Sequence, residues 1–81
     1  KLIKQSRLWE MMERTDASGD PLPFQLKYVK KNGEVREYAK CVLTSIHSMG
    51  TTLNVLPEGE STPRTIRRVT ITEFNHVRVY L

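Results

Sequence analysis

Polar and apolar positions follow two different periods along this chain. In residues 2–17 the apolar side chains recur at about 100° per residue, as on one side of a helix, and cations occupy much of the opposite side. The apolar members are Leu2, Leu8, Trp9 and Met12. Gly19 and Pro21 would end this helix, because glycine accepts a left-handed cap and proline cannot continue a helix.

From Phe24 onward the period changes to two, which is typical of half-buried strands. Five strand-like segments follow one another: residues 24–29, 35–46, 52–56, 65–74 and 77–81. Turn signals separate them every ten or so residues, as in small all-β folds. The pattern predicts one mainly β (α+β) domain over 1–81, with an N-terminal helix in 1–19 and a β unit in 22–81. The β unit should form a five-stranded antiparallel small barrel or curled meander of SH3-like or OB-like type.

Two dipeptides predict hairpin turns. Asn32-Gly33 accepts the positive φ angles of a tight turn, which would place Lys31 opposite Glu34. The strand that follows, 35–46, is long enough to bend or bulge.

The last hairpin, around Asn75-His76, has two possible registers. A three-residue loop over 74–76 is favoured, because it keeps one face of the hairpin apolar. It pairs Ile71 with Val79 and Val69 with Leu81, whereas a two-residue turn pairs Phe74 with Val77.

Composition narrows the class of protein. The longest apolar run, Cys41–Leu43, is far too short to span a membrane, and no secretory signal is visible. Cys41 is a single cysteine, which cannot form an internal disulfide and fits a reducing cytoplasm. It is expected to be a small buried side chain. The net charge of +4 and the isoelectric point of about 9.5 weakly favour polyanionic partners.

No catalytic, cofactor-binding or metal-binding residue is predicted. His47, His76 and Cys41 are the nitrogen and sulfur donors, and their spacing matches no known ligand pair. Glu34 and Glu37 lie among cations and are expected to pair with them. The four glycines are each isolated in turns, so no phosphate loop is present in the sequence.

Basic residues give the sequence its main functional signal. The favoured register places Arg68, Arg78 and Tyr80 on the outer face of the last hairpin, where they could hold phosphates and stack a base. The full candidate set for nucleic-acid contact is Arg64, Arg67, Arg68, Arg78 and Tyr80. A solvated face that protects a strand edge is the simpler alternative. A second basic group, Lys27, Lys30 and Lys31, lies near the first hairpin turn.

The competing hypothesis is a structural or protein-interaction module that docks through the helix. Met11 lies off the apolar side of the predicted helix, and exposed methionine and tryptophan are enriched in interfaces. Trp9, Met11 and Met12 are the candidate contacts, with a protein partner or a second copy of the chain as the occupant.

Several segments together resemble a group of short uncharacterised proteins of gut Bacteroidetes and their phages or other mobile elements. They are Pro23–Val29, Gly33, Thr52–Pro57, Ile71–Asn75 and Val77–Leu81. The resemblance implies a mobile-element context and a cytoplasmic or virion-associated location, and it implies no activity. The group often has a glycine after the asparagine where this chain has His76, a departure that argues against a tight turn there.

Overall fold

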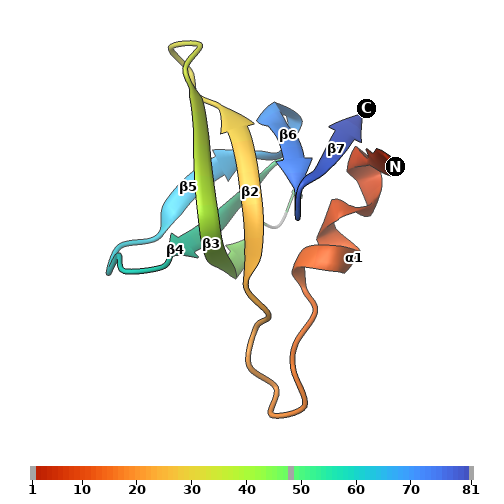
Figure 1. Ribbon diagram of the computed structural model, residues 1–81, viewed down its shortest axis with the longest axis vertical. Coiled ribbons are helices and arrows are strands. Elements are labelled where there is room, and N and C mark those ends of the chain that lie inside the picture. The colour runs from red at the N-terminus through yellow and green to blue at the C-terminus, as the bar shows by residue number, and fades with distance from the viewer. Residues whose placement is uncertain (1, 48, 81) are drawn as a thin grey trace.

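The computed structural model describes residues 2–47 and 49–80, which form one seven-stranded mixed sheet and a short N-terminal helix (Figure 1). The elements in chain order are strand β1 (Leu2–Lys4), 3₁₀ turn η1 (Gln5–Arg7), helix α1 (Leu8–Met12), β2 (Phe24–Val29), β3 (Val35–Ile46), β4 (Thr52–Pro57), β5 (Arg64–Arg67), 3₁₀ turn η2 (Arg68–Thr70), β6 (Ile71–Phe74) and β7 (Val77–Tyr80). The strand order is β1-β7-β6-β2-β3-β4-β5. In the described part of the chain, no helix is long and apolar enough to cross a membrane.

The prediction of a mainly β fold with an N-terminal helix is confirmed, and the prediction of five antiparallel strands is wrong. The sheet has seven strands, it is not closed, and β1 pairs with β7 in parallel. The extra strands arise at two places. One is the N-terminal segment, and the other is the segment 65–74 that was predicted as one strand.

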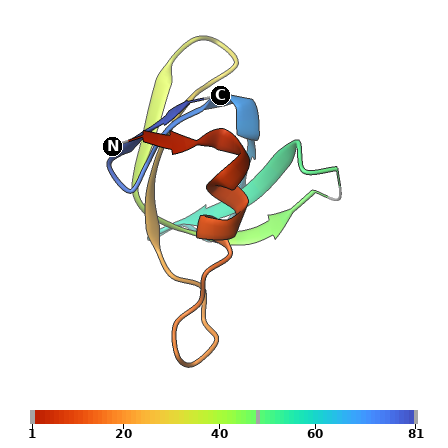
Figure 2. The same cartoon turned by 90° about the vertical axis from the view of Figure 1, so that its right-hand side faces the viewer.

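The N-terminal segment is a strand followed by a short helix instead of one long helix. Ile3 pairs with Val79 and packs against the core, while Leu2 is 62% exposed. Strand β7 would otherwise be a bare edge, and the hydrogen bonds it offers outweigh helical periodicity over three residues. Figure 2 shows β1 (red) beside β7 (dark blue), with the helix lying across the sheet. Gly19 does have a positive φ of 86°, but it lies in a loop well beyond the end of α1.

The segment 65–74 is broken by η2 because its two halves pair with different strands. β5 pairs with β4, and β6 pairs with β2, so the chain must cross from one side of the sheet to the other. The 3₁₀ turn makes this change of direction, and the Thr70 hydroxyl donates to the Arg67 carbonyl across it (2.6 Å). Two adjacent polar residues, Arg67 and Arg68, interrupt the alternating pattern at this break, and the prediction of one continuous strand overlooked that interruption.

A single apolar core lies between the sheet and α1. Leu8 and Met12 from α1 join strand residues in it, and the Phe24 and Phe74 rings lie 5.1 Å apart. Each fully buried side chain of this size contributes about 1.5–3 kcal/mol to folding. Cys41 is buried, as predicted, and burial raises the pKa of its thiol to about 12.

The long strand β3 bulges, as its length suggested, at the shift of register between Leu43 and Ser45. The first hairpin turn differs from its prediction by one residue. Val29 pairs with Val35, and the Lys30 N–H donates to the Glu34 carbonyl, so Lys30 and not Lys31 lies opposite Glu34. Only Gly33 of the Asn32-Gly33 pair has a positive φ, which makes this a three-residue loop closed by a glycine bulge.

The last hairpin has the two-residue turn, so the favoured three-residue register is wrong. Phe74 pairs with Val77, and both Asn75 (φ 50°) and His76 (φ 64°) are left-handed. Strand β2 holds this turn through Gln25: its side-chain Oε1 accepts from the His76 N–H (2.8 Å), and its backbone N–H donates to Asn75 Oδ1 (3.0 Å). The pairing once expected for Leu81 lies outside the described residues.

His76→Gly should therefore stabilise the fold. A left-handed backbone costs a residue with a Cβ on the order of 1 kcal/mol, which glycine avoids, although glycine gains entropy in the unfolded chain. We expect the free energy of unfolding to rise by about 0.5 kcal/mol, measured by urea denaturation in a buffer that contains the metal chelator EDTA. His47→Gly, at a histidine without positive φ, is the control and should lower it. A loss of stability in His76→Gly would contradict this interpretation of the turn.

Candidate nucleic-acid interface

The structure spreads the five predicted contact residues over three elements and does not place Arg68 on one hairpin face with Arg78 and Tyr80. Arg64 and Arg67 lie in β5, Arg68 in η2, and Arg78 and Tyr80 in β7. Strands β5 and β7 have four other strands between them in the sheet order. The predicted shared face required one continuous strand before the last turn, and η2 removes that continuity.

Arg68 is held by contacts within the protein. Its guanidinium carbon lies 5.5 Å from the centroid of the Trp9 ring, and its carbonyl accepts a hydrogen bond from Gln5 Nε2 (2.9 Å). Its Nε is buried and has no hydrogen-bond partner among the described residues. Arg68 therefore fastens the N-terminal segment to η2, and the stacked tryptophan stabilises its charge.

Arg64 is already paired with an acid. Its Nε donates to Glu60 Oε1 (3.0 Å), and this hydrogen bond raises the pKa of the guanidinium. A phosphate would have to compete with that carboxylate. Arg78 and Tyr80 are exposed on β7, with Arg78 directly opposite Glu73 in the register.

A different basic surface is assembled where the curled sheet brings β5 beside the end of β2. A groove of about 280 Å³ lies there, lined by Tyr28, Val29, Lys30, Lys31, Thr65, Ile66, Arg67 and Thr70. Three of these side chains are cations, and none is an acid. The groove joins Arg67, one of the predicted contacts, to Lys30 and Lys31 of the second basic group.

Tyr28 and Tyr38 form an aromatic pair at the groove. Their rings lie 5.8 Å apart at 42°, and their hydroxyl oxygens are 3.2 Å apart. Burial and the hydrogen bond to Tyr28 raise the pKa of Tyr38 to about 12, while the positive charges of Arg64 and Arg36 act in the opposite direction. Arg36 lies opposite Tyr28 in the register and adds its positive charge beside the groove, whereas Arg64 is paired with Glu60.

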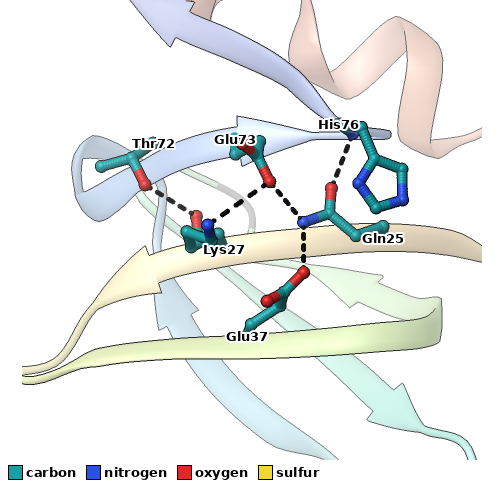
Figure 3. A network of polar contacts seen from close by, with 6 residues as sticks. All are labelled: Gln25, Lys27, Glu37, Thr72, Glu73 and His76. Atoms are coloured by element: carbon teal, nitrogen blue, oxygen red, sulfur yellow. Dashed lines mark hydrogen bonds and ion pairs between the residues drawn. The ribbon is translucent and has the colours of Figure 1, made fainter.

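The opposite face of β2 carries a polar network of a different character (Figure 3). Gln25 Nε2 donates to Glu37 (3.0 Å) and to Glu73 (2.7 Å), and Lys27 Nζ lies 3.7 Å from Glu73. The predicted pairing of Glu37 with strand cations is not seen among the described residues, since its partner is an amide. His76 completes this group, and its ligand atom and those of Glu37 and Glu73 all lie within 4.8 Å of one another.

The residues proposed for a protein contact are partly withdrawn from the surface. Met12 is 1% exposed and belongs to the core, so it cannot contact a partner, contrary to the prediction. Trp9 and Met11 are half-buried and pack against the same core. The helix is only five residues long, and its apolar side packs against the interior of the molecule.

Sequence reasoning missed Tyr28, Tyr38 and Arg36 as candidates, although part of the basic surface was visible in the sequence. Lys30 and Lys31 already formed a basic group in the sequence. The sequence did not reveal how the chain turns at η2, or that the end of β5 lies beside the end of β2.

The Tyr38 environment makes stability depend on pH above neutrality. Because the folded pKa is raised from 10.0 to about 12, Tyr38 stabilises the fold fully below pH 10, and this contribution is lost as pH rises through about 12. Urea denaturation from pH 9 to 12 should show a smaller loss for Tyr38→Phe than for the wild type. Tyr80→Phe, on the exposed face of β7, is the matched control, and equal profiles for wild type and Tyr38→Phe would contradict the assignment.

Comparison with known proteins adds no relative to these observations. No protein-family model, no curated protein and no solved structure matches the chain.

Proposed function

We propose that this protein is a non-enzymatic nucleic-acid-binding module and that the groove between β2 and β5 is its binding surface. The observation that carries the proposal is the convergence of Lys30, Lys31 and Arg67 on one groove that also contains Tyr28. Cations in this arrangement hold phosphates, and a tyrosine ring offers a base a stacking surface. The predicted hairpin site is replaced by this groove, with Arg67 common to both.

Single-stranded nucleic acid suits the groove best. A tyrosine ring at the groove can meet a base only if that base is unstacked, which a single strand allows and an intact duplex does not. Arg36 lies opposite Tyr28 in the register and would extend the path of the nucleic-acid backbone beyond the groove.

The finer fold assignment, an SH3-like small barrel, is also a proposal. Four successive antiparallel strands β2–β5, a 3₁₀ turn, and a strand β6 that returns to pair with β2 support it. Shared architecture does not establish shared function, so the nucleic-acid proposal depends on the groove and not on this likeness.

Binding is tested by fluorescence anisotropy with labelled 15-nucleotide single-stranded DNA and RNA and the matching duplexes at several salt concentrations. If three cations contact phosphates, log affinity should fall against log salt with a slope of about −2 for single strands. The double variant Lys31→Gln/Arg67→Gln should bind more weakly, and its slope should approach about −0.7, because one phosphate contact remains.

The matched control is Arg14→Gln/Arg78→Gln, which removes the same charge from exposed positions outside the groove. It should retain the wild-type slope. Equal losses in the two double variants would show that net charge alone drives association, and would contradict the groove as the site. Absence of binding by the wild type at low salt would contradict the function itself.

A further inference from the structure

Three metal-ligating side chains from different segments meet on the outer face of β2. In the register Glu37 on β3 and Glu73 on β6 both lie opposite Lys27, one on each side, and the turn after β6 adds His76. One ligand atom from each of the three lies within 4.8 Å of the others. Two carboxylates and an imidazole form a ligand set that divalent transition metals accept.

A buried amide positions the two carboxylates. Gln25 is 3% exposed, and its Nε2 donates one hydrogen bond to Oε2 of Glu37 and one to Oε2 of Glu73. Its Oε1 accepts from the His76 backbone, so the same side chain also fixes the turn that presents the imidazole (Figure 3). Hydrogen bonds of this kind orient ligands beneath a metal ion and commonly alter affinity by about 10–100-fold when removed.

The spacing requires only a small adjustment. Zinc binds imidazole nitrogen and carboxylate oxygen at about 2.0–2.2 Å, so two ligand atoms on one ion lie roughly 3–4 Å apart. The ligand atoms therefore need to close by up to about 2 Å, which rotation of the exposed side chains of Glu37 and His76 can provide. The buried partner, Gln25, would stay in place.

Cations already lie near the two carboxylates and would have to give way to a metal ion. The Lys27 ammonium, on a side chain that is 36% exposed, lies 3.7 Å from Glu73 Oε2, and Arg78 lies opposite Glu73 in the register. A divalent ion would bind beside the Gln25 amide, to which both Oε2 atoms are hydrogen-bonded, and would displace the Lys27 ammonium toward solvent. Lys27 is thus a competitor of the metal and not a ligand.

From these contacts, we propose that Glu37, Glu73 and His76 bind one divalent transition-metal ion of the zinc type, oriented by Gln25. Imidazole selects such ions over magnesium and calcium, which prefer oxygen ligands alone. Because side chains alternate along β2, Gln25 and Lys27 face the metal site while Tyr28 faces the groove, so the two sites are independent. The ion would bridge β3 to the β6–β7 turn across β2 and hold the sheet together there.

The test uses the 81-residue chain without a polyhistidine tag. Calorimetric titration with ZnCl₂, and visible absorption on titration with CoCl₂, should show one ion per chain. His76→Gly removes the imidazole at a backbone conformation that glycine prefers, and should weaken binding by about tenfold or more. Glu73→Gln should do the same. Lys27→Gln should strengthen binding, because it removes the competing ammonium.

The control is His47→Asn, which removes the other histidine from the β3–β4 loop and should leave binding unchanged. The proposal is overturned if the wild type binds neither ion, if His76→Gly binds as the wild type does, or if His47→Asn loses as much as His76→Gly. Nucleic-acid binding by His76→Gly should equal that of the wild type, so failure of either proposal leaves the other standing.

Discussion

The hydrogen bonds of one buried side chain, Gln25, connect β2 to β3, to β6 and to the turn after β6. A buried amide must satisfy both its donors and its acceptor, since each unmet group costs about 1–3 kcal/mol. Gln25 meets this requirement with Glu37, Glu73 and the backbone of His76, which come from β3, β6 and the last turn. The hydrogen bonds of Gln25 thus hold three segments in register around β2.

This constraint explains why the two asparagine turns exchange the conformations expected of them. Asn32-Gly33 has the sequence of a tight turn, yet it forms a three-residue loop, because Val29 and Val35 pair one position out of that register. Asn75-His76 lacks the glycine but takes the tight form, with Asn75 Oδ1 and the His76 N–H both bonded to Gln25. Local turn preference is worth on the order of 1 kcal/mol, and a few tertiary hydrogen bonds exceed it.

Sequence could predict the elements that depend on local periodicity. The bounds of β3 and the bulge within it follow from its length and composition, and the burial of Cys41 follows from its strand context. The N-terminal helix was overestimated, because Ile3 gains a partner strand that no local pattern reveals. The break at η2 was missed for a related reason, since the two halves of the segment 65–74 pair with different strands.

The break at η2 also changes where the basic side chains lie, compared with what the sequence predicted. The arginines of the last eighteen residues looked like one basic surface, but Arg68 stacks on Trp9 and Arg64 is bound by Glu60. By turning the chain at η2, the fold instead carries Arg67 toward Lys30 and Lys31. Strand β2 then separates two kinds of chemistry by alternation alone: residues 25 and 27 support the acidic cluster, and Tyr28 turns toward the cationic groove. The groove cations Lys30, Lys31 and Arg67 are therefore kept away from Glu37 and Glu73, whereas Lys27 lies on the face of the carboxylates and pairs with Glu73.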